Sequence, residues 1–106
     1  MSTVNPDITK VFQTIVVGSG QGSLSFDNGL AHELLQITVE PPNATTTYSV
    51  YIKDILDDME IFRREDDVVG TLNELLSTAL PLCGANTLYI ENASEDGAYK
   101  IRVVYR

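Results

Sequence analysis

The last twenty residues of the chain constrain its fold most strongly. Residues 87–92 and 99–106 are predicted to form two β-strands joined by a turn at 93–97. In the second strand the apolar side chains share one side and the polar ones the other, which is typical of a sheet with one buried and one solvated face. The inward residues are Tyr99, Ile101, Val103 and Tyr105, and the outward ones are Lys100, Val104 (the apolar exception), Arg102 and Arg106. Asp96-Gly97 supplies the turn, because glycine accepts the positive φ of a tight reversal. The fold class is therefore antiparallel β, with the C-terminus inside the fold.

The first predicted strand, residues 8–17, is apolar on both of its sides. One side carries Val11, Ile15 and Val17, and the other carries Phe12, Thr14 and Val16. Apolar residues on both sides predict burial on both, either between two sheets or between subunits. This segment therefore supplies the candidate partner contacts Val11, Phe12 and Ile15.

Four more strands are predicted along the chain, at residues 23–27, 34–40, 46–53 and 59–63. The inward sets are Leu24 and Phe26, then Leu35, Ile37 and Val39, then Tyr48, Val50 and Ile52. Turns are predicted at 18–22 and at Asn28-Gly29. Six or seven short strands at regular spacing predict a single domain, residues 1–106, with an antiparallel β-sandwich of Greek-key or jelly-roll type.

The segment after residue 70 predicts one short helix, from Thr71 to Ala79. Thr71 and Glu74 fit a capping box, and Val68, Leu72, Leu75, Leu76 and Leu80 approximate helical spacing. The alternative is an irregular loop that covers one end of the sandwich. Pro81 and Gly84 are expected to end the segment in either case.

Composition excludes several classes of protein. The chain has 106 residues and a net charge of −8, which repels nucleic acid phosphates. No run of about 18 apolar residues is present, so we expect no membrane span. The N-terminus has neither a basic nor an apolar region of the kind found in a signal peptide, so this segment is not expected to be a secretory signal.

No motif in the sequence predicts catalysis or a cofactor. The glycine-rich stretch at 18–22 is not a dinucleotide site, because its third glycine comes one residue early and no helix follows. Cys83, the one cysteine, lies among leucines and is expected to be a small hydrophobe. His32, the one histidine, is expected at the surface, at the start of a strand. We therefore expect a protein that is not an enzyme and that has no cofactor.

An acidic cluster occupies the middle of the chain. Its members are Asp54, Asp57, Asp58, Glu60, Glu65, Asp66 and Asp67. Asp54, Asp57 and Asp58 are weak candidate ligands for calcium, but the spacing is not that of an EF-hand. Arg63 and Arg64 lie within the cluster and can neutralise it. A solvated or partner-facing acidic surface, which includes Glu65, Asp66 and Asp67, is the favoured interpretation.

The outward side chains Lys100, Arg102 and Arg106 form a basic row. They either pair with Glu91 and other acids across the sheet or face the acidic segment 54–67 of another copy. All three are therefore candidate partner contacts.

The β-rich segment 8–27, the final run 82–103 and the small size together resemble small β-sandwich virion proteins of tailed phages, of the capsid decoration or cement type. That resemblance implies a virion protein, assembled in the host cytoplasm, which binds the outer capsid surface as a dimer or trimer and braces the shell. It also implies no enzymatic activity and no cofactor.

Two hypotheses about function follow. The leading one is a non-enzymatic structural protein that adds to a larger assembly, most plausibly a phage capsid. Its rival is a carbohydrate- or ligand-binding sandwich module, in which exposed Tyr51 and Tyr89 stack on sugar rings and the acidic loop holds calcium. A subunit of an enzyme whose activity lies in a partner chain is a third, weaker hypothesis.

Overall fold

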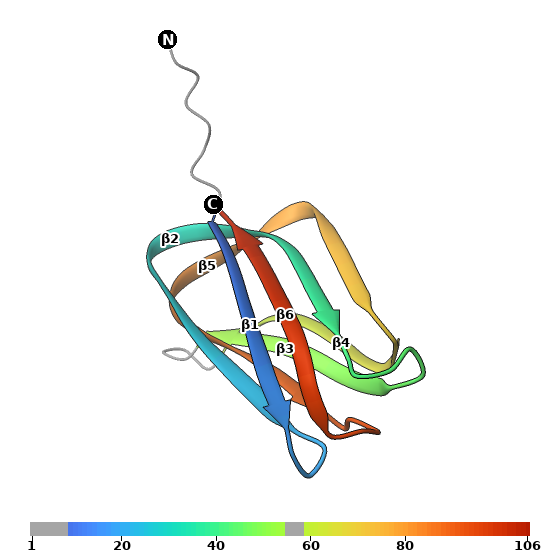
Figure 1. The fold of residues 1–106 in the computed structure, drawn as a ribbon. Helices are drawn as coiled ribbons and strands as arrows, with labels where there is room; N and C mark the ends of the chain where they lie inside the picture. Colours follow the sequence, from blue (N-terminus) through green and yellow to red (C-terminus); the bar gives the residue numbers. More distant parts are fainter. Residues whose placement is uncertain (1–8, 55–58) are drawn as a thin grey trace.

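Six β-strands make up the part of the chain that the computed structural model describes, residues 9–54 and 59–106 (Figure 1). Side chains are not described at 9–10, 27–32, 59, 65–67 and 77–84. The strands are β1 (Thr9–Val17), β2 (Gly22–Glu40), β3 (Thr47–Asp54), β4 (Met59–Val69), β5 (Leu72–Glu91) and β6 (Gly97–Tyr105). Their spatial order is β1-β6-β2-β5-β3-β4, and every pairing is antiparallel. No helix among these described residues is long and apolar enough to cross a membrane.

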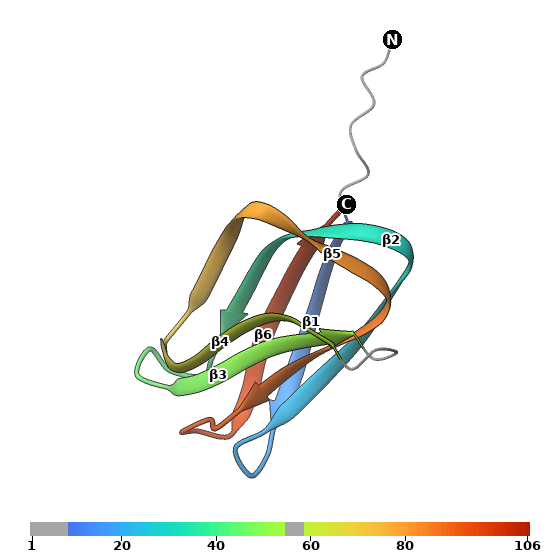
Figure 2. The same ribbon diagram turned by 180° about the vertical axis from the view of Figure 1, so that it is seen from behind.

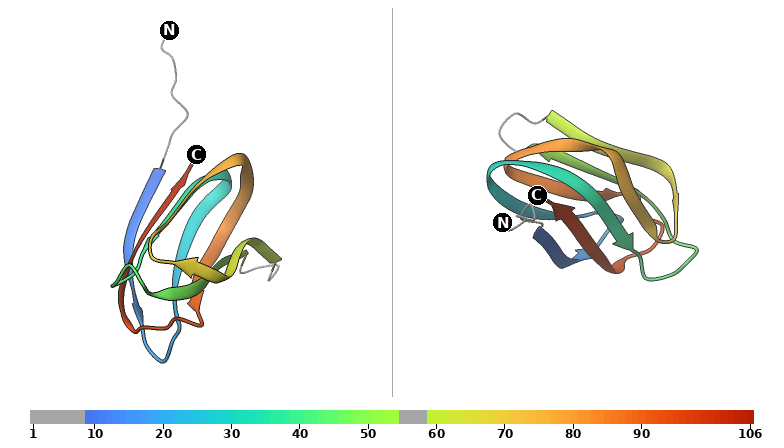
Figure 3. Two further views of the ribbon diagram at one scale, coloured as in Figure 1. Left: turned by 90° about the vertical axis from the view of Figure 1, so that its right-hand side faces the viewer. Right: turned by 90° about the horizontal axis from the view of Figure 1, so that it is seen from above.

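The strands form two layers, because the long strands β2 and β5 bend and contribute to both. The first layer contains β1, β6, the second half of β2 and the beginning of β5. The second layer contains the beginning of β2, the end of β5, β3 and β4. Figure 3 shows the bend of β2 and β5 between the layers, and Figure 2 shows β3 and β4 from behind. The predicted all-β, jelly-roll-like sandwich is confirmed.

The sandwich has two opposite lateral sides, which we call the β1 side and the β4 side. On the β1 side, β1 lies over the beginning of β2, so closely that a Cβ atom at Gly22 would lie 2.6 Å from Cγ2 of Ile15. On the β4 side, β4 lies beside the beginning of β5. There, Nε of Arg64 donates a hydrogen bond of 2.9 Å to Oε1 of Glu74 and so connects the two layers.

The core lies between the layers and follows the period-two pattern of the sequence. The inward sets predicted for β6 and β3 are all buried, and Phe26 from β2 and Phe62 from β4 join them. Leu24 packs partly against this core. Val104, the exception on the outer face of β6, is also buried.

The predicted helix at Thr71–Ala79 is wrong, because these residues begin strand β5. Leu72 pairs with Val39 and Leu75 pairs with Gln36, so backbone pairing with β2 outweighs the helical propensity of leucine and alanine. Pro81 and Gly84 lie within β5 rather than ending it. Strand β4 also extends beyond the predicted 59–63.

The predicted turn at Asn28-Gly29 is wrong as well, because β2 continues through it. The β2–β5 register shifts between Asp27 and Ala31, within a strand that serves both layers. A second shift between Leu34 and Gln36 changes which side chains face inward. Leu34 is therefore fully buried and Leu35 only half-buried, whereas Ile37 and Val39 face the core as predicted.

Candidate functional site

Strand β1 exposes the apolar side chains on its outer face. Phe12 is 63% exposed and Val16 is 77% exposed, with exposed Thr14 between them. Sequence analysis predicted burial on both sides of this strand, but within one chain only the inner side is buried. A large exposed apolar side chain on an edge strand is a common feature of protein contact surfaces.

Strand β6 places two basic residues beside these side chains. In the β1–β6 register, Phe12 lies opposite Arg102 and Thr14 lies opposite Lys100. We call Phe12, Thr14, Val16, Lys100 and Arg102 together the β1–β6 surface. It combines an apolar strip with neighbouring positive charge, which suits a protein partner better than a small ligand.

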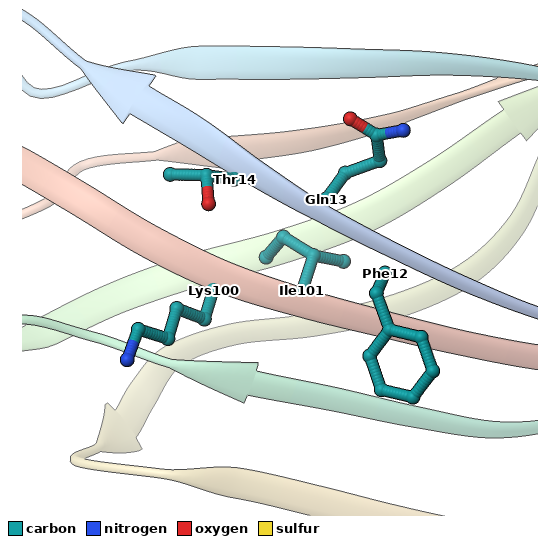
Figure 4. A pocket seen from close by; sticks show the side chains of 5 residues that line it. All are labelled: Phe12, Gln13, Thr14, Lys100 and Ile101. Carbon is teal, nitrogen blue, oxygen red and sulfur yellow. The ribbon is translucent and has the colours of Figure 1, made fainter.

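Two shallow hollows adjoin Phe12 on this surface. One, of about 490 Å³, is lined by Phe12, Gln13, Thr14, Lys100 and Ile101 (Figure 4). The other, of about 330 Å³, is lined by Phe12, Thr38, Glu40, Lys100, Ile101 and Arg102.

The basic row on β6 pairs with β2 across the sheet. Nζ of Lys100 lies 3.9 Å from Oε1 of Glu40, and Nε of Arg106 lies 3.3 Å from Oε1 of Glu33. Arg102 donates from Nη2 to Oγ1 of Thr38 at 3.1 Å. The predicted cross-strand ion pairs are therefore present, but not with Glu91. Exposed ion pairs of this kind contribute little stability, so Lys100 and Arg106 can leave Glu40 and Glu33 and pair with acidic groups of another protein at little cost.

The outer face of the second layer is covered by its own side chains. Tyr51 is only 8% exposed and stacks on Tyr89, with ring centroids 4.9 Å apart. The Arg63 guanidinium lies 4.7 Å from the centroid of the Tyr51 ring. Burial and a hydrogen bond to Glu91 raise the pKa of Tyr51 to about 12. The expectation that Tyr51 is exposed for stacking on sugars is therefore wrong.

The β4 side carries two further exposed apolar side chains. Val69 at the end of β4 is 59% exposed, and Leu75 near the beginning of β5 is 76% exposed. Sequence analysis missed both as surface residues, because it assigned Leu75 to the apolar face of a helix. Apolar and polar residues do not alternate at 72–76 (Leu, Asn, Glu, Leu, Leu), so the sequence carried no signal of the exposure of Leu75.

The glycine-rich turn binds a carboxylate of the chain itself. Ser19 and Gly20 both have positive φ, and their backbone N–H groups donate to Asp96 at 3.2 and 2.9 Å. Successive N–H groups in such a turn form an anion-binding concavity. Here the Asp96 side chain occupies it, in agreement with the prediction that 18–22 is a turn and not a nucleotide site.

The remaining predicted residues are placed as follows. Ile15 is 2% exposed and Val11 half-buried, so both face the core, and of the three β1 candidates only Phe12 faces outward. Asp54 ends β3, whereas Asp57 and Asp58 lie outside the described residues. Among the described residues, no three His, Cys, Asp or Glu side chains are grouped as metal ligands.

Five other predicted residues lie in strands at positions where side chains are not described. Glu65, Asp66 and Asp67 belong to β4, His32 belongs to β2, and Cys83 belongs to β5. The roles predicted for these side chains stay predictions.

Comparison with known proteins gives a fold but no family. No protein-family model matches the chain, and no curated protein matches it. Among solved structures it is similar to the Drosophila NLP core, with a TM-score of 0.55 and 11% sequence identity over 92% of this chain and 95% of that one. The NLP-core structure was described in relation to pentamer formation and histone binding. At this identity the likeness shows the β-sandwich fold alone.

Proposed function

We propose that this protein is a non-enzymatic structural protein that forms a homo-oligomer and binds the outer surface of a larger protein shell, as capsid decoration proteins do. The observation that carries the proposal is the exposure of Phe12 and Val16 on edge strand β1. Exposed apolar side chains beside a sheet edge that no other described strand pairs with favour association with another protein. The resemblance of the sequence to cement proteins is the reason for proposing a phage capsid as this shell.

The similar NLP core supports the oligomeric part of this proposal. Its structure is associated with a pentamer, so the shared β-sandwich fold is compatible with a homo-oligomer. The same structure is associated with histone binding. Together with a net charge of −8, this favours as a second candidate a protein that binds a basic protein partner.

A sedimentation experiment tests the proposal against the second candidate. The purified protein is mixed either with expanded, undecorated capsid shells of a tailed phage or with core histones as a basic-protein probe. We expect it to pellet with the shells, and we expect the double variant F12S/V16S to bind at least about tenfold more weakly. Thr45→Ser, an exposed loop substitution, is the matched control.

The outcomes separate the alternatives. Binding to histones without binding to shells supports the second candidate. Absence of the protein from the shell pellet at every salt concentration contradicts the decoration proposal. Binding of F12S/V16S as tight as that of the unchanged protein contradicts the role of β1 in shell contact.

A further inference from the structure

One cation of the basic row on β6 has no acidic partner. Lys100 pairs with Glu40, and Arg106 pairs with Glu33. Arg102, which lies between them in the row, makes no ion pair with any side chain that the structure describes, and its Nε atom is buried without a hydrogen-bond partner there. A guanidinium presents a planar fork of N–H donors that matches a carboxylate. Arg102 therefore keeps donors and a positive charge for another molecule.

A chain of hydrogen bonds holds the Arg102 guanidinium in position. Its Nη2 atom donates to Oγ1 of Thr38 at 3.1 Å, and that hydroxyl donates to Oδ1 of Asn73 at 3.0 Å. Nε2 of Gln36 donates to the same oxygen of Asn73 at 2.7 Å. The bonds run from β6 across β2 to β5. A guanidinium that is already positioned loses little conformational freedom on binding, which favours a specific polar contact.

Exposed apolar side chains flank Arg102 on the outer face of the first layer. Phe12 of β1 lies opposite Arg102, and the same row continues with Thr38 on β2 and Asn73 on β5. Leu75 lies two residues after Asn73 and so shares this outer face, where it is exposed. An arginine among exposed apolar and aromatic side chains is the composition found at the centre of protein interfaces.

A hollow beside Arg102 has room for a carboxylate side chain. It is the hollow of about 330 Å³ that Phe12 and Arg102 line together. Glu40, the acid in its lining, already pairs with Lys100. Every other acidic side chain that the structure describes also has a partner within the chain. A second copy would have to break such a contact to supply the carboxylate and would bring its own net charge of −8, so another protein is the better source.

We propose that this outer face binds an acidic segment of the partner protein, with one carboxylate paired to Arg102 in the hollow and apolar side chains of the same segment packed on Phe12 and Leu75. The proposal rests on the proposed function, because it states the chemistry of the shell segment that meets β1. An arginine–carboxylate pair surrounded by apolar side chains is partly shielded from water. Its loss therefore weakens binding more than the loss of an exposed ion pair.

Short peptides test the proposal without shells. Three labelled peptides alternate valine with glutamate, glutamine or lysine, and fluorescence anisotropy measures their binding to the purified protein. We expect only the glutamate peptide to bind, and we expect Arg102→Met to weaken that binding at least about tenfold. Arg63→Met removes the same charge from the second layer and is the matched control, which is expected to bind the peptide like the unchanged chain.

Circular dichroism checks that the variants are folded. If Arg102→Met does not fold, Arg102→Lys replaces it, since lysine keeps the charge but loses the fork and is also expected to bind more weakly. Undiminished binding by the folded Arg102 variant overturns the proposal. Equal binding of the glutamate and glutamine peptides overturns it too, and so does a glutamate peptide that fails to bind at about 1 mM.

Two further outcomes separate this proposal from its alternatives. An oligomer of the unchanged chain that Arg102→Met dissociates, measured by light scattering, assigns the face to a second copy and overturns the proposal. Binding of the glutamate peptide without sedimentation with shells supports the acidic partner and contradicts the decoration proposal. Sedimentation with shells without binding of the glutamate peptide does the reverse.

Discussion

Tyr48 and Tyr99 each connect the core to a loop. Their rings meet edge to face, with centroids 5.7 Å apart, and both are fully buried. The Tyr48 hydroxyl donates to the carbonyl oxygen of Gly70 at 2.7 Å, and the Tyr99 hydroxyl donates to that of Glu95 at 2.6 Å. A buried hydroxyl needs such a partner, so these bonds stabilise both the core and the loop conformations.

The protein is expected to lose stability in alkaline solution because of its tyrosines. Burial raises the pKa of Tyr48 and Tyr99 and, with the bond to Glu91, raises that of Tyr51 to about 12. Well below pH 10 the folded and unfolded chains are equally protonated at these tyrosines, so these groups add no pH dependence to the stability there. Above it the unfolded chain loses protons first, and the free energy of unfolding falls by up to about 1.4 kcal/mol per pH unit for each such tyrosine.

Urea denaturation at a series of pH values measures this effect, with tyrosine ionisation followed by ultraviolet absorbance. Tyr51→Phe is expected to reduce the slope above about pH 10, because one titrating group is gone. An unchanged slope in that variant contradicts the assignment to Tyr51.

At the scale of elements, the loops at one end of the sandwich hold the strand ends in fixed positions. Glu95 accepts hydrogen bonds from Nδ2 of Asn43 and from Oγ1 of Thr46, which lower the pKa of its carboxyl group. Asp96 accepts from the backbone of Ser19 and Gly20. The loops before β2, β3 and β6 are therefore connected to one another.

Gly70, between β4 and β5, lies at this end of the molecule in a position where a larger residue would be strained. Its φ is +70°, and a Cβ atom there would lie 2.8 Å from the carbonyl oxygen of Ala44. Gly70→Ala is expected to lower the free energy of unfolding by roughly 1–3 kcal/mol, from backbone strain and loss of the Tyr48 contact. Thermal or urea unfolding measures the change.

Gly18→Ala is the matched control for that substitution. A Cβ atom at Gly18 meets nothing within 4 Å, so its effect is expected to stay within about 0.5 kcal/mol. Equal effects of the two substitutions contradict the explanation from strain.

At the scale of the whole molecule, β6 joins the two ends of the chain. It lies between β1 and β2, pairing Tyr105 with Thr9 and Arg102 with Thr38. It also supplies four of the buried core side chains, Tyr99, Ile101, Val103 and Tyr105. The first layer therefore cannot form until the last residues have been added.

A chain that ends at Asp96 is expected not to fold, because β1 loses β6, with which it pairs along its whole length. Circular dichroism is expected to show no cooperative thermal transition. A chain that ends at Tyr105 is the control, since it loses only the contacts of Arg106 with Glu33, which are two backbone hydrogen bonds and one exposed ion pair. Cooperative unfolding of the shorter chain contradicts the role of β6 in closing the sheet.

The strands in which apolar and polar residues alternate could be predicted, because this alternation identifies the inward side chains whichever strand lies beside them. β3 and β6 belong to this class. The segment at 71–79 could not, since its leucines fit a helix and a strand about equally and only pairing with β2 decides between them. The continuation of β2 through Asn28-Gly29 is a long-range effect of the same kind.

The candidate site, too, could be predicted from the sequence only in part. The sequence indicated that β1 is apolar on both sides and that β6 carries a basic row. It did not indicate which side of β1 the core covers, nor that Val69 and Leu75 are exposed.

The sequence by itself determined an all-β class, the inward faces of its regular strands and an excess of negative charge, because period and composition are local properties. The tertiary structure decided the strand order, the bends of β2 and β5 and which apolar side chains stay exposed, because these depend on pairings between residues far apart along the chain. Burial of a side chain is settled by what packs on it, and distant strands supply that packing.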